Sequence, residues 1–347
     1  MSSKLQSSAA WQAGFLSFLY NQLIVRPKAL PPTTSLVGQT AIITGANRGL
    51  GFEAVRQLLE LGLSHLVLAV RSQSKGDDAA AKLRTQFPNA KIETSSLDMC
   101  DYDSITAFAR RCEELDRIDF VILNAAVIMR EFERNPKTGH EMTFQIDYLS
   151  TALLTVLMGS VLKGKKNQSS RTGNPPVLSV AGSGIIYTSK LATTGPVLAQ
   201  FDNPDKYSQL GDYGNSKLAL MMFTSKLAAQ ISPQDVIINV FDPGFTRDTN
   251  IGNTKEDPRF AIRYLWPIVV KAFARQLRAG ASIYAYALLG VGKESHGSFV
   301  GDWTIKAYPP VMYTKAGEAL RDRLWEETME ELNFAGASSI VSRLRTN

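Results

Sequence analysis

Short apolar runs alternate with longer amphipathic stretches along the middle of the chain. Each run spans four to six residues, as expected for a strand that is buried on both faces of a parallel sheet. Each longer stretch repeats its apolar residues every three or four positions, which is typical of a helix. The runs predict strands at residues 40–44, 66–70, 91–95, 120–123, 177–181 and 236–241, and the stretches predict helices at about 49–61, 77–86, 103–115, 144–162 and 213–231.

Repeated strand–helix units predict an α/β fold. We expect a Rossmann-type doubly wound parallel sheet with helices on both faces, that is, three α/β/α layers, with ligands at the carboxyl ends of the strands. This domain would occupy residues 36–312, and residues 246–312, with a helical stretch near 259–291, would form a substrate lid. Residues 313–347 are expected to form a C-terminal extension, a helix at 316–332 followed by a ragged tail.

The N-terminal residues 1–35 precede the alternation, and the prolines at 27, 31 and 32 indicate a linker. The apolar, aromatic segment at residues 11–25 predicts a helix. Two interpretations stay open: a helix packed on the domain, or one that docks on a membrane surface or a partner. The segment lacks a small-residue cleavage site and is broken by polar residues, so neither a signal peptide nor a membrane span is expected.

Composition narrows the function classes. The 347 residues are 44% hydrophobic and 20% charged, with a net charge of +6, and no basic run with interleaved aromatic residues occurs, so nucleic-acid binding is not expected. Cys100 and Cys112 are the only cysteines, which indicates a reducing compartment and a cytoplasmic protein without disulfides. The three histidines lie far apart, so no metal site is expected.

A long, polar connection at 163–176 and another long connection at 184–212 interrupt the alternation of strands and helices. Long loops in compact domains are often functional.

The turn TGANRGLG, residues 44–51, lies between the first predicted strand and helix. Gly45 permits a tight turn, while Gly49 and Gly51 let the backbone approach a pyrophosphate. Free N–H groups and the positive end of the helix dipole would hold the phosphates. Because strand, glycine turn and helix follow in order, the pattern predicts a dinucleotide site.

Four motifs together resemble the short-chain dehydrogenase/reductase family. They are TGANRGLG, the LNAA segment at 123–126, the YGNSK segment at 213–217 and the NVFDPG segment at 239–244, in the family's order over about residues 36–249. The proline-rich lead-in and the long insertion before Tyr213 are similar to fungal members of secondary metabolism. The resemblance implies a possible homodimer formed through the helices at about 103–162 and 213–231, although the C-terminal extension could block that contact.

Cofactor preference follows from the end of the second strand. NAD-binding members usually place an acid there for the ribose 2′-hydroxyl. Here the strand ends at Val70-Arg71-Ser72, and no acidic residue lies between this strand and Asp77. Arg71 and Arg48 would hold a 2′-phosphate, which favours NADP(H). The predicted cofactor-binding residues are Gly45, Asn47, Arg48, Gly49, Leu50, Gly51, Arg71, Asp98, Met99, Asn124, Ala125, Tyr213, Lys217, Pro243, Gly244, Phe245 and Thr246, with Asp98 as the family's adenine-contacting acid.

Tyr213 and Lys217 lie one helical turn apart, so both side chains point from one face. Tyr213 would act as the acid/base, and Lys217 would lower its pKa and bind the nicotinamide ribose. Ser183, which follows the fifth strand, would hold the substrate carbonyl; Ser189 is the alternative if the run at 185–189 is the strand. In the loop after the sixth strand, Phe245 would cover the nicotinamide and Thr246 would bind its carboxamide, with Thr249 as a weaker candidate.

Asp147 departs from the family pattern, in which an Asn at this place helps to hold a water. An ionised Asp147 near Lys217 would oppose the Tyr213 phenolate. The main hypothesis is an NADP(H)-dependent oxidoreductase that acts on a ketone or secondary alcohol. Because the insertion and the lid are apolar, its small-molecule substrate is expected to be bulky and hydrophobic. The alternatives are a non-redox isomerase or cyclase that uses Tyr213 as an acid, and a dinucleotide-sensing regulatory protein.

Overall fold

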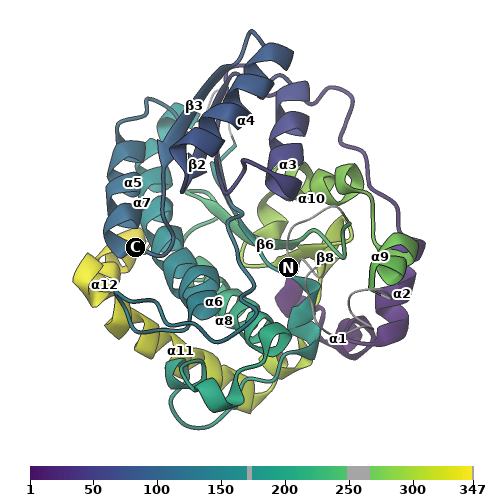
Figure 1. Cartoon of the computed structure of the whole chain (residues 1–347), viewed down its shortest axis with the longest axis vertical. Coiled ribbons are helices and arrows are strands. Elements are labelled where there is room, and N and C mark those ends of the chain that lie inside the picture. The colour runs from purple at the N-terminus through teal and green to yellow at the C-terminus, as the bar shows by residue number, and fades with distance from the viewer. Residues whose placement is uncertain (170–173, 248–265, 346–347) are drawn as a thin grey trace.

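A single eight-stranded sheet forms the centre of the protein. The structure is a computed structural model that describes residues 1–169, 174–247 and 266–345. The strand order is β3-β2-β1-β4-β5-β6-β7-β8, parallel except for the last strand (Figure 1). The strands are β1 (Thr40–Thr44), β2 (His65–Val70), β3 (Lys91–Ser96), β4 (Phe120–Leu123), β5 (Val177–Ala181), β6 (Ile237–Asp242), β7 (Phe299–Gly301) and β8 (Thr304–Lys306). The predicted doubly wound sheet is confirmed, and β7 and β8 are additions to it.

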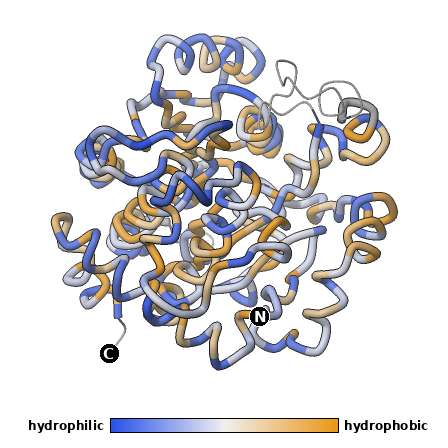
Figure 2. The backbone as a smooth tube through the Cα atoms, turned by 60° about the horizontal axis from the view of Figure 1, so that its bottom comes forward, coloured by the Kyte–Doolittle hydropathy of each residue, from blue (hydrophilic) through white to orange (hydrophobic). Residues whose placement is uncertain are grey.

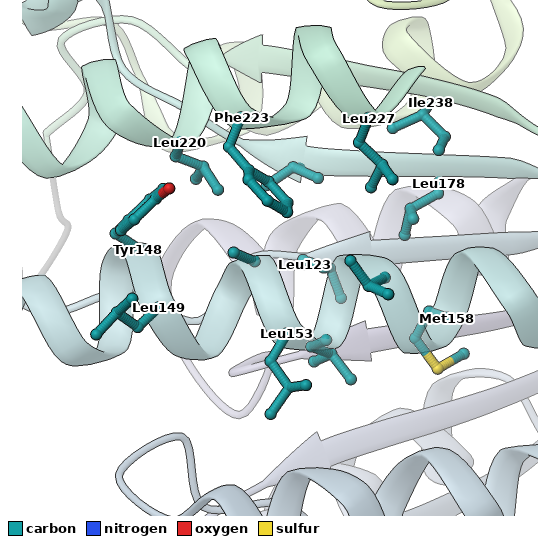
Figure 3. Packing of buried hydrophobic residues seen from close by; sticks show 14 of the residues in the cluster. Leu123, Tyr148, Leu149, Leu153, Met158, Leu178, Leu220, Phe223, Leu227 and Ile238 are labelled. Atoms are coloured by element: carbon teal, nitrogen blue, oxygen red, sulfur yellow. The ribbon is translucent and has the colours of Figure 1, made fainter. Parts of the chain in front are cut away.

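Helices cover both faces of the sheet and produce the three predicted layers (Figure 1). One layer contains α3 (Gly49–Glu60), α4 (Gln73–Gln86) and α10 (Leu277–Leu289). The other contains α5 (Tyr102–Glu113), α7 (Thr151–Ser169) and α8 (Gln209–Ala228), and α7 is preceded by α6 (Met142–Phe144) and the π-helical turn η2 (Gln145–Ser150). Figure 3 shows leucine, phenylalanine and methionine side chains of α7 and α8 packed over apolar residues of β4, β5 and β6.

The stretch Met142–Asn167 is the only helix in the described part of the chain that is long and apolar enough to cross a membrane. Its apolar window is 89% buried inside the protein. It is therefore the central helix of the core, where apolar residues on every face are expected.

The C-terminal extension forms two helices rather than one. α11 (Lys315–Glu331) packs on α8, and α12 (Ala337–Leu344), where a ragged tail was expected, packs on α7. Val341 and Leu344 of α12 are buried in the same core as α7. The two helices thereby cover surfaces of α7 and α8 that the predicted homodimer would use.

The range predicted as a lid contains structural parts of the domain. Within it, α10 packs against α3 and the sheet, and β7 and β8 extend the sheet. Residues 248–265 of this range, including Thr249, lie outside the described residues. The helix α9 (Trp266–Phe273) precedes α10.

The insertion between β5 and α8 buries its apolar side chains in the core. Leu191, Val197, Leu198 and Phe201 are all buried, and the Phe201 ring stacks on Phe144 with centroids 3.9 Å apart. The expectation that these side chains offer an apolar surface to a substrate was therefore wrong. Within the insertion, η5 (Leu198–Gln200) packs against α11.

Charged groups of the C-terminal helix hold this insertion. The Glu327 carboxylate accepts hydrogen bonds from the backbone N–H groups of Val197 and Leu198. His140 forms a second connection: its Nδ1 lies 2.8 Å from Asp202 of the insertion, and its Nε2 lies 3.5 Å from Glu331 of α11. Burial alone would lower the pKa of His140, but the two carboxylates outweigh it and raise this pKa to about 9.

This raised pKa predicts a pH-dependent stability. The fold favours protonated His140, so its contribution is fully present below the ordinary value of 6.5 and is lost as the pH rises through about 9. We expect His140→Gln to lower the urea unfolding midpoint near pH 6, and the difference from the parent protein to shrink above about pH 9. A difference that stays constant over this range would contradict the ion pairing.

Candidate functional site

The glycine turn between β1 and α3 is fixed by hydrogen bonds to the end of β4. The Thr44 hydroxyl accepts from the backbone N–H groups of Asn124 and Ala125, both at 2.9 Å, and Asn124 Nδ2 donates to the Thr44 carbonyl. Gly45 adopts φ +66°. A Cβ atom on Gly51 would lie 2.6 Å from Asn124 Nδ2, so only glycine permits this approach.

The amino end of α3 has the features that a phosphate site requires. No side chain caps this end of the helix, so its N–H groups are not satisfied by a capping residue. Gly49 has φ +60°, and no atom lies within 4 Å of the place of a Cβ atom, which leaves open space at the turn. These features fit the requirements of a pyrophosphate site, in which helix N–H groups and the helix dipole bind the phosphates.

Residues proposed for the adenosine half meet at the carboxyl ends of β2 and β3. Arg71 is exposed, and its guanidinium reaches the thiol of Cys100. Asp98 accepts a hydrogen bond from the Cys100 N–H at 2.9 Å, so Arg71 and Asp98 lie around one thiol. Asp77 is occupied elsewhere, accepting from Thr94 and Gln73. Burial and the charge of Asp98 raise the pKa of Cys100 to about 11, so it is a neutral thiol.

Three other predicted cofactor residues belong to the glycine turn, and Met99 follows β3. Arg48, the residue before α3, is exposed, Asn47 is half-buried, and the Leu50 side chain is buried. Met99 is also buried, and its carbonyl accepts from Ser150 Oγ at 2.6 Å. The Met99 backbone carbonyl is thus engaged by a buried serine of η2.

Tyr213 and Lys217 point into the fold from α8, toward the ends of β5 and β6. The Lys217 Nζ donates to the carbonyl of Ala181, the last residue of β5, at 3.1 Å, and lies 5.7 Å from the centre of the Tyr213 ring. Ser183 follows two residues later and lies close enough to Tyr213 to lower the pKa of its phenol. The structure therefore brings Ser183 to Tyr213, whereas Ser189 Oγ donates to the Ile185 carbonyl.

Asp147 completes this group from the π-helical turn η2. It is fully buried, its Oδ1 accepts from the Val127 N–H at 2.8 Å, and its Oδ2 lies 3.4 Å from Lys217 Nζ. That separation exceeds the length of a strong charged hydrogen bond, and Oδ2 has no hydrogen-bond partner in the described part of the chain. A π-helical turn is a frequent feature of functional sites, where it redirects side chains.

The titration of these groups is coupled. Burial raises the pKa of Asp147 and outweighs the lowering effects of Lys217 and the Val127 N–H. Burial also raises the pKa of Tyr213, the charge of Asp147 raises it further, and the hydrogen bond with Ser183 lowers it. In this arrangement the Tyr213 phenol is protonated, and its pKa is raised rather than lowered, contrary to the expected effect of Lys217.

The loop after β6 is fixed from two sides. Gly244 has φ +72°, and the Phe245 carbonyl accepts from Gln22 Nε2 of the N-terminal segment. The Thr246 hydroxyl donates toward the carbonyls of Pro243 and Gly244. The proposed nicotinamide-facing residues thus form one tight turn.

Asp242 is a residue of the candidate site that the sequence reasoning missed. Its Oδ1 accepts from the Gly244 N–H at 2.9 Å, and the Gly184 N–H also donates to this carboxylate. One half-buried side chain therefore connects the loop that carries Ser183 with the turn at Pro243–Thr246. The signal in the sequence was a carboxylate directly before the Pro-Gly pair.

Tyr284 of α10 plays a similar part on the other side, since its hydroxyl donates to Asn124 Oδ1 at 2.5 Å. With both Nδ2 and Oδ1 engaged, the Asn124 amide cannot rotate away from the glycine turn. No pattern in the sequence connected α10 with that turn.

Comparisons with known proteins agree with this geometry. Residues 39–173 match the family model described as short chain dehydrogenase. Over 99% of both chains, the sequence is 50% identical to short chain dehydrogenase virL of Hypocrea virens. The chain belongs to the short-chain dehydrogenase/reductase family.

Other members of this family are also similar to the chain. The short chain dehydrogenase/reductase mfmJ of Annulohypoxylon moriforme is 42% identical over 95% of both chains. Among solved structures, L-sorbose reductase from Gluconobacter frateurii, complexed with NADPH and L-sorbose, has a TM-score of 0.59 at 16% identity and covers 77% of this chain and 96% of its own. NADPH-dependent 3-quinuclidinone reductase from Rhodotorula rubra has a TM-score of 0.57 at 20% identity, with 80% and 96% covered. These likenesses show the fold, and the family is one of nicotinamide-dependent oxidoreductases.

The contact at Gly51 gives a test of the glycine turn of this dehydrogenase/reductase. Gly51→Ala would push its Cβ against Asn124, which is held on both sides, so we expect the free energy of unfolding to fall by about 1–3 kcal/mol and NADPH binding to weaken. Urea unfolding and a fluorescence titration measure the two effects. Gly164→Ala, in a helix with no atom within 4 Å, is the matched control and should not destabilise the protein. An unchanged Gly51→Ala variant would contradict the close approach.

Proposed function

We propose that the protein is an NADP(H)-dependent oxidoreductase that reduces a ketone, or oxidises a secondary alcohol, of a bulky hydrophobic substrate. The observation that carries this proposal is the meeting of Ser183, Tyr213 and Lys217 at the carboxyl ends of β5 and β6. The uncapped glycine turn at the end of β1 lies on the same edge of the parallel sheet. A dinucleotide held at the turn would extend toward Tyr213 along this edge.

Each side chain has a role that its position supports. When bound, the nicotinamide supplies or accepts a hydride at the carbonyl carbon. The Ser183 hydroxyl would hold the carbonyl oxygen, and the Tyr213 hydroxyl beside it would give its proton to that oxygen during reduction. The Lys217 ammonium would stabilise the resulting phenolate and bind the ribose hydroxyls. Gly49 and its neighbours would bind the pyrophosphate.

The preference for NADP(H) is supported by Arg71 and Arg48. Both are exposed, with Arg71 at the end of β2, where an acid is usual in NAD-binding domains. The nearest acid along the chain, Asp77, is held by Thr94. A planar guanidinium binds a phosphate in a bidentate manner, which a ribose hydroxyl cannot match.

The proposed hydrophobic substrate is supported by residues next to the reacting groups. Ile185 follows Ser183 by two positions, and Val127 donates to Asp147; both apolar side chains are half-buried. The similar fungal enzymes of secondary metabolism suggest a metabolite intermediate of that class, such as a polyketide or terpenoid.

The 2′-phosphate site is tested with Arg71→Ala. We expect NADPH binding, measured by cofactor fluorescence, to weaken by roughly tenfold or more because a charged hydrogen bond is lost, while NADH binding stays unchanged. Lys82→Ala, which removes an exposed charge from α4, is the control. Equal losses for NADPH and NADH, or no loss, would contradict the proposed preference.

A second candidate function follows from the buried Asp147–Lys217 pair. If the charge of Asp147 holds Tyr213 as a neutral phenol, the same site supports a non-redox isomerase or cyclase in which Tyr213 gives a proton. Turnover of substrate without oxidation of NADPH would favour this candidate. No observation in the site favours a purely regulatory dinucleotide sensor, because the proton donor is intact.

Asp147→Asn tests the role of this charge. The amide keeps the shape and can still accept from the Val127 N–H, but it removes a charge that raises the pKa of Tyr213. Because reduction needs protonated Tyr213, we expect the decline of kcat at high pH to begin at lower pH in the variant. Tyr213→Phe is the control, which should bind NADPH but lose turnover. An unchanged pH profile would show that Asp147 carries no charge during turnover.

A further inference from the structure

The N-terminal helix α2 (Phe15–Leu23) has its polar and apolar sides reversed relative to a helix on a soluble domain. Ser17 and Gln22 are its buried residues, while Phe15 and Leu16 are 71% and 67% exposed. Helices on a domain normally bury the apolar face. The polar side here makes the contacts with the rest of the protein, and the apolar side faces outward.

These outward residues all lie within residues 11–24, and we call them together the apolar face of α1–α2. Its members come from α1 (Gln6–Gln12), α2 and the residue that follows, and each is at least 39% exposed: Trp11, Phe15, Leu16, Phe18, Tyr20, Leu23 and Ile24. The Phe15 and Phe18 rings stack with centroids 6.2 Å apart. Isolated exposed apolar residues are common, but a gathered set of this size marks a binding surface.

The helix α9 lies next to α2 (Figure 1), and Figure 2 shows it as the largely hydrophobic coil that follows the grey trace. Val269 and Phe273 of α9 are 38% and 37% exposed. Arg275, two residues beyond α9, donates to the Asn21 carbonyl of α2 at 2.6 Å and connects the two segments. The apolar face thus has a second helix at its border.

The charged residues of the N-terminal segment have one sign. No acidic residue occurs before Glu53, and no charged residue lies between Lys4 and Arg26. Lys4, Arg26 and Lys28 border the face and are exposed. A partner for this surface must therefore be apolar at its centre and negative at its border.

We propose that the apolar face of α1–α2 docks on the surface of a phospholipid bilayer with anionic headgroups. Phenylalanine and leucine would enter the acyl boundary, Trp11 and Tyr20 would lie at the headgroup level, and the basic residues would contact lipid phosphates. The nine residues of α2 are too few to span a bilayer, so the helix would lie in the plane of the interface. A second copy of this chain fits less well, because two such faces would bring like charges together.

This location would place the reaction site at the lipid surface. Gln22, on the buried side of α2, donates to the Phe245 carbonyl, and Arg275 donates to Asn21 and to Asp302. The docking helix is therefore attached directly to the turn proposed to face the nicotinamide. A hydrophobic substrate dissolved in the bilayer would meet the site without crossing water. This consequence rests on the proposed function, whereas the docking itself does not.

Vesicle flotation with the full chain tests the proposal. The probes are vesicles of phosphatidylcholine alone and of phosphatidylcholine mixed with phosphatidylserine. We expect the parent protein to float with the mixed vesicles and less with phosphatidylcholine alone. Phe15→Ser with Leu16→Ser should reduce vesicle binding at least about tenfold, because burial of these apolar side chains in the bilayer drives the binding. Leu210→Ser with Val37→Ser changes equally exposed apolar residues elsewhere and is the matched control.

A second pair separates the electrostatic contribution. Arg26→Glu with Lys28→Glu should reduce binding to the anionic vesicles by about tenfold or more, whereas Lys82→Glu with Lys315→Glu, the same change of charge away from the face, should not. Thermal unfolding checks that the variants fold, and NADPH titration shows that the cofactor site is intact, so failure of docking is distinguished from failure of the proposed function.

Two results would overturn the proposal. One is a parent protein that floats with neither vesicle, or a Phe15→Ser, Leu16→Ser variant that floats as well as the parent. The other is self-association of the parent protein without vesicle binding, abolished by the same two substitutions, which would assign the face to a second copy of the chain.

Discussion

A buried ammonium is the constraint around which the site is built. Lys217 is 2% exposed, and an unpaired charge at such depth would be strongly unfavourable. Its partners are the carbonyl at the end of β5 and the carboxylate of Asp147, so the position of a strand end, a helix and a π-helical turn must agree. The position of the neighbouring Tyr213 and the pKa of its phenol depend on this arrangement. Stability of the core and chemistry of the site therefore depend on the same charge.

The repeated units could be predicted from sequence because buried parallel strands leave a strong apolar pattern. Each of the six predicted strands appears within one residue of its expected limits. The glycine turn was predictable for a related reason, since a close backbone approach at Gly51 permits no side chain. Local sequence determines these features, and local sequence was enough to find them.

Features that depend on distant contacts were missed. β7 and β8 have three residues each, and the turn between them uses Asp302 and Trp303 at positive φ, which is unusual for non-glycine residues. Trp303 tolerates this conformation because it is buried and its indole N–H donates to Ser282. α12 is short and acquires its stability from α7. Asp242 was missed because its two partners come from different loops.

The start of the chain meets a late part of it, residues 298–313, in the folded protein. The backbone N–H of Ser2 donates to Ser298 Oγ, the Ser2 hydroxyl accepts from Phe299, and the Ser2 carbonyl accepts from Tyr313. During synthesis the N-terminal helices therefore leave the ribosome long before their partners exist. The apolar N-terminal segment with its basic borders therefore lacks its folded contacts while most of the chain is translated. Chaperones or a lipid surface would meet this segment first, and docking of Ser2 would be among the last steps of folding.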